Sequence, residues 1–140
     1  MTDVKLPEGY TPSEDEEYMN PRQLEYFRQK LLTWKKELME EADTTISHLR
    51  EENWQEPDIN DRASLEEGAA LELRTRDRYR KLLKKIDKAL ERIEDESYGY
   101  CEDTGDEIGI KRLEARPIAT LTLEAQEKHE RLEKQRREER

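Results

Sequence analysis

The chain has 140 residues, of which 44% are charged and only 32% are hydrophobic. This composition excludes a large single core and is typical of a coiled coil or another thin helical assembly. The formal net charge of −10 disfavours sequence-independent binding to duplex DNA, which needs a basic surface. The single cysteine excludes an intramolecular disulfide, and no stretch approaches the roughly 20 apolar residues of a membrane span. Because the N-terminus also lacks the pattern of a secretion signal, we expect a cytoplasmic protein without membrane contact.

Residues 1–19 are predicted to form an acidic N-terminal arm. They contain two prolines, one glycine and six acidic side chains against one lysine. Such a segment is typically mobile or loosely docked. A purely solubilising tail is the simpler alternative.

A long helix is predicted to begin at Asn20 and Pro21. Asn20 can accept hydrogen bonds from the free amides of the first turn, and Pro21 suits the first helical position because it has no amide proton to satisfy. Side chains with coiled-coil spacing then recur at steps of three, four or seven residues. They are Leu24, Phe27, Leu31, Trp34, Leu38, Thr45 and Leu49.

A second helix is predicted after Asp61, which can cap it, with Ser64 and Glu67 as a secondary capping box. Its own seam consists of Leu65, Ala69, Tyr79, Leu83, Ile86, Leu90 and Ile93. Two such helices joined by a short turn predict an antiparallel coiled-coil hairpin over residues 20–96, with its tip at 54–63. Gly68 and Glu72 weaken the seam near this tip.

Residues 99–126 are laid out like a zinc ribbon, with glycine turns, a short strand-like run and the four-residue blocks "CEDT" and "TLEA"; the degenerate ribbon-like segment itself is assigned to residues 97–121. A structural zinc needs four ligands, but these blocks offer one cysteine, and adding His129 still leaves two ligands missing. We therefore expect a metal-free segment in which Thr104 and Thr122 bond the backbone and Ala125 packs. Burial of apolar side chains would hold it together; these are Tyr100, Ile108, Ile110, Leu113, Leu121 and Leu123.

Thr122 is predicted to cap a last helix, over residues 122–140. The fold class that follows is mainly α, with a long antiparallel coiled-coil hairpin and a small globular domain. That domain combines the metal-free, zinc-ribbon-like β-turn segment with the C-terminal helix. No catalytic constellation or glycine-rich phosphate loop is present, so an enzyme is not expected.

Asp58 and Asp61 lie three residues apart in the turn "PDINDRA". Aspartate is common in turns and at helix N-caps, so a structural role is one interpretation. The other is that both carboxylates project into a cavity of a partner, where they reach a metal ion, a basic group or a backbone amide. On the residues alone, both interpretations remain open.

Four basic residues share one broad face of the second helix: Arg74, Arg78, Lys81 and Lys85. The simple interpretation is a solvated face that pairs with the acids of "KKELMEE" in the first helix. A sharper interpretation joins Lys85 to Arg112 and Arg116 in a cationic site for a phosphate-rich ligand. The spacing by itself does not choose between them.

The tip "DINDRA" and the run "YGYCEDTGDEIGIKRLEARP" closely resemble the DksA/TraR family of bacterial transcription factors. The resemblance covers nearly the whole chain. It implies a non-catalytic regulator, expected to be monomeric, whose hairpin enters the secondary channel of RNA polymerase at the β′ subunit without contacting DNA. It also implies that the regulator acts together with ppGpp. The two would lower open-complex stability at ribosomal RNA promoters and help activate amino-acid biosynthesis promoters.

The family pattern of aspartate, two residues, aspartate, one residue, alanine falls on Asp58, Asp61 and Ala63. The resemblance implies that these residues act near the polymerase active site. Arginines that meet the rim of the polymerase channel fall on Arg74 and Arg78. A Gre-like transcript-cleavage factor, which uses the same channel, and a generic coiled-coil interaction protein are the alternatives.

The resemblance places a ppGpp pocket, shared with the polymerase, at Leu82, Lys85, Arg116 and Gln126. Gln126 stands where a lysine is expected, which removes one positive charge. Family members usually carry two CxxC pairs, whereas this chain reads CxxT and TxxA. In this respect it is similar to the cysteine-poor members that keep activity without zinc, and no zinc is expected.

Overall fold

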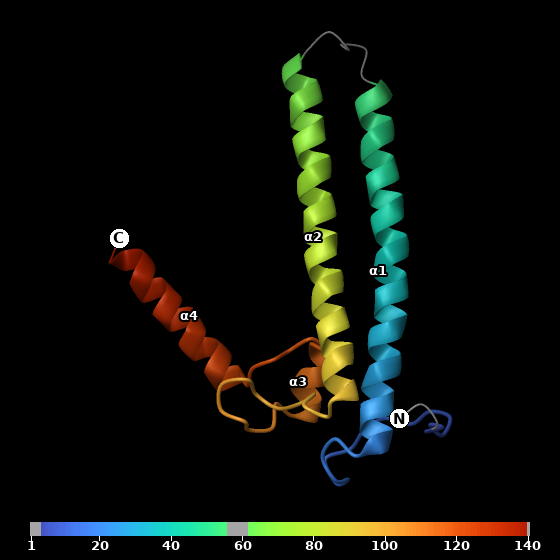
Figure 1. Cartoon of the computed structure of the whole chain (residues 1–140), viewed down its shortest axis with the longest axis vertical. Helices are drawn as coiled ribbons and strands as arrows, with labels where there is room; N and C mark the ends of the chain where they lie inside the picture. The colour runs from blue at the N-terminus through green and yellow to red at the C-terminus, as the bar shows by residue number, and fades with distance from the viewer. Residues whose placement is uncertain (1–3, 56–61, 140) are drawn as a thin grey trace. The chain divides into compact units, whose positions relative to one another are not determined.

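The computed structural model describes residues 4–55 and 62–139. Their helices are α1 (Pro21–Gln55), α2 (Arg62–Glu94), α3 (Ile110–Ala115) and α4 (Leu123–Glu138) (Figure 1). The described residues contain no β-strand, and an isolated antiparallel bridge pairs Tyr100 with Glu107. The predicted mainly α class, with a helical hairpin and a C-terminal helix, is confirmed. None of the described helices is long and apolar enough to cross a membrane.

The chain divides into two compact units. The base unit comprises residues 1–31 and 88–140, and the hairpin unit comprises residues 32–87. Both long helices contribute to each unit, because the division falls within α1 and again within α2. Each unit is described below by its own contacts.

The start of α1 follows directly from its sequence. The side-chain oxygen of Asn20 accepts hydrogen bonds from the amides of Arg22, at 2.9 Å, and Gln23, at 3.1 Å. Pro21 is the first helical residue. The predicted cap is therefore confirmed, and it satisfies two amides that would otherwise lack a helical partner.

The hairpin unit is antiparallel, since α1 and α2 run side by side in opposite directions (Figure 1). Three cross-helix contacts define the pairing: Lys35 Nζ lies 2.7 Å from Asp87 Oδ1, and Arg50 Nε lies 2.6 Å from Glu72 Oε1. Between them the hydroxyls of Thr45 and Tyr79 are 3.2 Å apart. Partners on α2 move toward lower numbers as those on α1 rise, which fixes the register.

Burial along the hairpin seam is uneven. Leu38 and Ile86 are buried as predicted, and Thr75, which the seam did not include, is buried as well. The expected burial of Leu65 and Ala69 is wrong, since Leu65 is 44% exposed and Ala69 is also exposed. The first turns of α2 therefore gain little stability from apolar burial.

The base unit has the larger apolar core. Phe27, Leu31, Ile93 and Leu113 are fully buried. Tyr98, which the sequence pattern did not single out, is also buried and donates a hydrogen bond of 2.7 Å from its hydroxyl to the carbonyl of Pro117. This bond gives a buried hydroxyl the partner that it needs away from water.

The ribbon segment, residues 97–121, differs from the sequence expectation. Its strand-like run begins α3 at Ile110, because Gly109 turns the chain with a φ of 101° and "IKRLEA" contains good helix formers. Ile108, Ile110 and Leu113 are buried as expected. Tyr100 and Leu123 are not, with Leu123 53% exposed.

The residues before α1 make more contacts than a loosely docked arm would. Tyr10 donates a 2.8 Å hydrogen bond to Glu16, and its ring packs edge-on against Tyr26 of α1. Met19 is buried. The acidic composition gave no indication of these contacts, because they depend on a few aromatic and apolar side chains within the acidic sequence.

Candidate functional site

A stripe of side chains on α2 carries the strongest candidate site of the hairpin unit. Arg74, Arg78, Leu82 and Lys85 follow one another at steps of four, four and three, which places them on one helix face. The three cations are exposed and Leu82 is half-buried. The Arg78 guanidinium lies 5.7 Å from the centre of the Tyr79 ring, a cation–π contact. We call these four residues the cationic stripe.

Within the part of the chain that the structure describes, Arg74, Arg78 and Lys85 form no ion pair. Other cations on α2 behave differently, since Arg80 and Lys81 both pair with Asp77. Pairing of the stripe with acids of the first helix, the simple interpretation, is not seen among these residues. The charge of the stripe is therefore available to an external anionic surface.

The ion pairs between α1 and α2 have the opposite placement of charges from that interpretation. Lys35 and Arg50 of α1 supply the bases, while Asp87 and Glu72 of α2 supply the acids. All four groups are at least partly exposed, so each pair contributes little stability. These pairs instead help to align the two helices.

The predicted tip carboxylates Asp58 and Asp61 lie outside the described residues. Ala63 lies in the first turn of α2, where it is exposed. The role of these three residues remains a prediction.

Arg116 and Gln126 belong to the base unit. Arg116 is exposed at the C-terminal end of α3, where its amide donates a 2.7 Å bond to the carbonyl of Arg112. An open pocket of about 560 Å³ has a mixed lining, with the cations Arg116, Arg112 and Lys111 beside the acids Glu14, Glu107 and Glu124. Gln126 is half-buried in α4, and its amide donates to Glu130 at 3.3 Å. Leu82 and Lys85 belong to the hairpin unit, so a pocket shared by all four residues stays a prediction.

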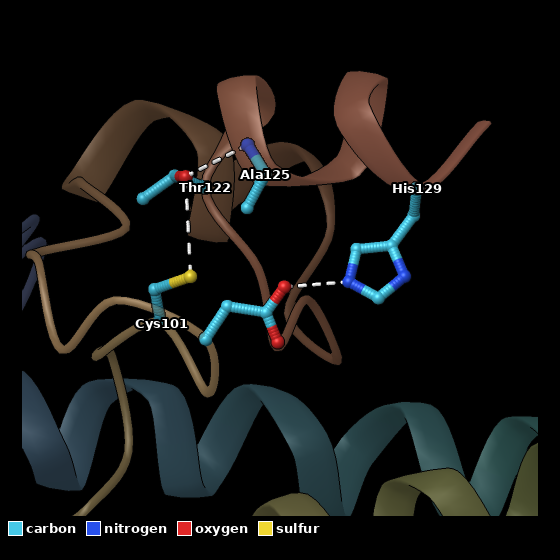
Figure 2. A network of polar contacts seen from close by, with 5 residues as sticks. Cys101, Thr122, Ala125 and His129 are labelled. Carbon is cyan, nitrogen blue, oxygen red and sulfur yellow. Dashed lines mark hydrogen bonds and ion pairs between the residues drawn. The ribbon is translucent and has the colours of Figure 1, made fainter. Parts of the chain in front are cut away.

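A small hydrogen-bonded cluster surrounds Cys101, where two CxxC pairs would bind zinc (Figure 2). The Thr122 hydroxyl points toward Cys101 Sγ at 3.9 Å and accepts a 3.2 Å bond from the Ala125 amide, which caps α4. The Thr104 hydroxyl accepts from the Asp106 amide at 3.2 Å. The predicted backbone bonds of Thr104 and Thr122, and the packing of Ala125, are confirmed.

Cys101 is itself only 4% exposed. Burial acts to raise the pKa of its thiol, but hydrogen bonds from Thr104 and from the backbone amide of Thr122 outweigh burial and lower the pKa to about 7. These donors favour the thiolate because they point toward the developing negative charge. The sulfur is thus held by hydrogen bonds.

His129 points from α4 toward the ribbon segment (Figure 2). Its Nε2 lies 2.5 Å from Asp103 Oδ2, and both side chains are largely exposed. The contact joins α4 to the turn that follows Cys101. His129 is engaged with a carboxylate here and is not directed at a cluster of metal ligands.

Comparison with known proteins decides the family. Residues 23–93 match the family model described as DnaK suppressor protein DksA, N-terminal domain, and residues 96–131 match the prokaryotic dksA/traR C4-type zinc finger. The RNA polymerase-binding transcription factor DksA of Caulobacter vibrioides is 63% identical over 125 residues, which cover 89% of this chain and 88% of that protein. The chain belongs to the DksA/TraR family. The resemblance predicted from the sequence is confirmed.

Other DksA proteins support the same placement. The RNA polymerase-binding transcription factor DksA of Escherichia coli is 51% identical over 128 residues, covering 91% of this chain and 85% of that protein. The solved structure of transcription factor DksA2 from Pseudomonas aeruginosa is 42% identical and superposes with a TM-score of 0.73 over 84% of this chain and 90% of that one. These DksA relatives are named as transcription factors and not as enzymes.

The C4-type finger of the DksA/TraR family raises the question of zinc. Four cysteine thiolates hold the metal in such a site. Here the corresponding blocks supply the Cys101 sulfur, two threonine hydroxyls already bonded to backbone amides, and Ala125, which has no donor. Among the residues that the structure describes, no group of three or more metal-ligating side chains comes together. The donor set does not fit a C4 zinc site.

Proposed function

We propose that this protein regulates transcription by binding RNA polymerase directly, without catalysis and without direct DNA contact. The observation that carries the proposal is the 63% identity, over 89% of the chain, to a relative named as an RNA polymerase-binding transcription factor. The exposed cationic stripe supports it, because three unpaired cations on one helix face suit an acidic protein surface. The partner surface would be the rim of the secondary channel, at the β′ subunit.

The hairpin would enter that channel tip first. The 35-residue α1 is about 50 Å long at 1.5 Å per residue, so the hairpin would be long enough to extend deep into a channel. Asp58 and Asp61 would then lie near the polymerase active site, where their carboxylates meet basic groups or backbone amides. Such contacts would shift the stability of open complexes, lowering transcription from ribosomal RNA promoters and raising it from amino-acid biosynthesis promoters.

In this proposal ppGpp is the co-regulator. Lys85 and Arg116, both exposed and cationic, would bind its phosphates together with the polymerase, and Leu82 would contact its apolar surface. Gln126 contributes an amide where a lysine would add a charge. We therefore expect a ppGpp response that is present but weaker than that of a member with the lysine.

The decisive experiment is transcription in vitro from a ribosomal RNA promoter, with and without ppGpp, using the wild type and Asp61→Asn. The substitution keeps the shape of the side chain and removes its charge. Loss of inhibition, with unchanged polymerase affinity in a competition assay, is the expected result. Glu51→Gln is the matched control, because it removes one exposed carboxylate charge from α1 near the same end of the hairpin and should inhibit normally.

Three outcomes would contradict the proposal. Full inhibition by Asp61→Asn at equal polymerase affinity would show that the tip charge is not used. Stimulated transcript cleavage on backtracked polymerase would instead indicate a Gre-like cleavage factor. Absence of polymerase binding by the wild type would leave the chain as a general coiled-coil interaction protein.

A further inference from the structure

The ribbon segment lacks a fitting set of metal ligands, but the hydroxyl of Tyr18, a residue outside the segment, bonds its backbone at two points. Tyr18 Oη donates a hydrogen bond of 2.7 Å to the carbonyl of Gly99 and accepts one of 2.9 Å from the amide of Gly109. Gly99 directly precedes Tyr100, and Gly109 lies two residues after Glu107, so both glycines lie at the same end of the isolated bridge between Tyr100 and Glu107. One hydroxyl therefore connects the two sides of the bridge at that end.

This hydroxyl adds to the backbone bonds of the bridge. The Gly99 carbonyl also accepts a 2.8 Å bond from the Ile108 amide, and the Cys101 amide donates to the Asp106 carbonyl at 2.8 Å. The chain turns into α3 at Gly109, where the amide donates to the Tyr18 hydroxyl. A tyrosine hydroxyl can donate and accept at once, so Tyr18 satisfies that amide and stays bonded to the Gly99 carbonyl.

The side chain of Met19 packs close to the backbone of Gly99. A Cβ atom added to Gly99 would lie 2.9 Å from Cγ and from Sδ of Met19, and 3.2 Å from the Tyr18 hydroxyl. Gly99 has a φ of 91°, which L side chains rarely adopt. The absence of a side chain at residue 99 is thus what allows the two segments to approach so closely.

The Tyr18–Met19 pair is fixed to α1 through a buried glutamine. Gln23 is fully buried, its Oε1 accepts a 2.7 Å bond from the Met19 amide, and its Nε2 donates a 3.1 Å bond to the Ser13 carbonyl. Tyr18 also packs its ring edge-on against Tyr100, with 5.6 Å between ring centres. The pair is therefore a rigid support and not a passing contact of a loose arm.

We propose that the Tyr18–Met19 pair anchors the ribbon segment to the N-terminal segment through the backbone at Gly99 and Gly109. This anchor lies on the α3 side of the ribbon segment and is separate from the Cys101–Thr122 contact on the α4 side. Tyr18 precedes residue 23, so it lies outside both regions that match the family models. The inference concerns how the base unit is stabilised, and it holds or fails independently of the proposed function.

The test compares Tyr18→Phe with Tyr10→Phe in the full chain by amide hydrogen exchange. Both variants lose one tyrosine hydroxyl of the N-terminal segment, but the Tyr10 hydroxyl bonds Glu16 and does not touch the ribbon segment. In Tyr18→Phe the amide of Gly109 should exchange about tenfold faster, since the loss of one hydrogen bond of ordinary strength corresponds to such a factor. In Tyr10→Phe it should exchange at the wild-type rate. Equal Gly109 rates in both variants would overturn the inference.

The wild type provides a second test that does not depend on the folding of a variant. We expect the Gly109 amide to be protected, and a strong chelator to leave this protection unchanged. Loss of the protection on chelation would overturn the inference, because a metal ion and not the Tyr18 hydroxyl would then be holding the segment. An unprotected Gly109 amide in the wild type would overturn it as well, because the Tyr18 hydroxyl would then not be bonded there.

Discussion

The hydroxyl groups of Thr45 and Tyr79 lie 3.2 Å apart, across the seam between α1 and α2. Both side chains are half-buried, at seam positions where a coiled coil ordinarily places apolar side chains. A polar pair within a seam favours one register over its neighbours, because any shift leaves both hydroxyls without partners. The pair therefore helps to align α1 and α2 within the hairpin unit.

Tyr79→Phe should lower the free energy of unfolding by about 0.5–1.5 kcal/mol, the usual net worth of one hydrogen bond. The phenyl ring keeps the packing and removes the hydroxyl. Urea denaturation followed by circular dichroism measures the change. In the double variant with Thr45→Val, the two effects should be less than additive, and strict additivity would show that the hydroxyls are not coupled.

Phe27→Ala should destabilise the base unit by about 3–5 kcal/mol, since it leaves a cavity in a packed core. The Phe27 ring is fully buried and lies with its centre 5.6 Å from that of Tyr98. Thermal unfolding measures the loss. Leu32→Ala, at an exposed position of the same helix, is the control and should change stability by less than about 1 kcal/mol. Similar losses for the two variants would contradict the assigned core.

Cys101 should make the free energy of unfolding increase as the pH rises above about 7. Its folded pKa of about 7 lies below the ordinary value of 9, so the unfolded chain binds more protons between these values. The free energy of unfolding of the wild type, relative to Cys101→Ser, should therefore rise from about pH 7 to pH 9 and lose this increment as the pH falls through 7. Comparison with the serine variant removes contributions of other groups. Parallel pH profiles of the wild type and Cys101→Ser would contradict a lowered pKa of the Cys101 thiol.

Arg78→Ala should weaken polymerase binding several-fold, because it removes one exposed, unpaired cation from the cationic stripe. Arg80→Ala is the matched control, since Arg80 is on the same helix but is already paired with Asp77. Affinity is best compared by competition at two salt concentrations, where the Arg78 effect should shrink at high salt. Equal losses for both variants would argue against a specific role of the stripe.

Gln126→Lys should increase the ppGpp-dependent part of the transcriptional response by several-fold, if an added cation reaches the phosphates. Gln126 is half-buried near the start of α4, and its present bond to Glu130 is on the same helix, so the substitution should be tolerated. The assay is transcription in vitro over a series of ppGpp concentrations. Gln135→Lys, which adds the same charge at an exposed position near the end of α4, should leave the response unchanged. A rise in both variants would show a general charge effect.

Local patterns determined the helical elements. The Asn20 cap with Pro21, and the Thr122 cap of α4, act within a few residues of themselves, so the sequence contains everything that they need. Periodicity likewise predicted the hairpin and the burial of Leu38 and Ile86. It failed for Leu65, because an apolar residue at the right spacing is buried only where the facing helix covers it. For the candidate site, the stripe was recognisable by spacing and family motif, but spacing did not reveal which of its charges lack a partner.

The ribbon segment marks where sequence reasoning reached its limit. The sequence by itself determined that a C4 zinc site was short of ligands, since that conclusion requires only a count of donors. Only the tertiary structure decided which side chain anchors the segment, because Tyr18 and Gly109 are 91 residues apart and no local pattern pairs them. The same holds for Met19 against Gly99: long-range packing depends on how separate elements meet, whereas caps, seams and ligand counts depend on neighbours in the chain.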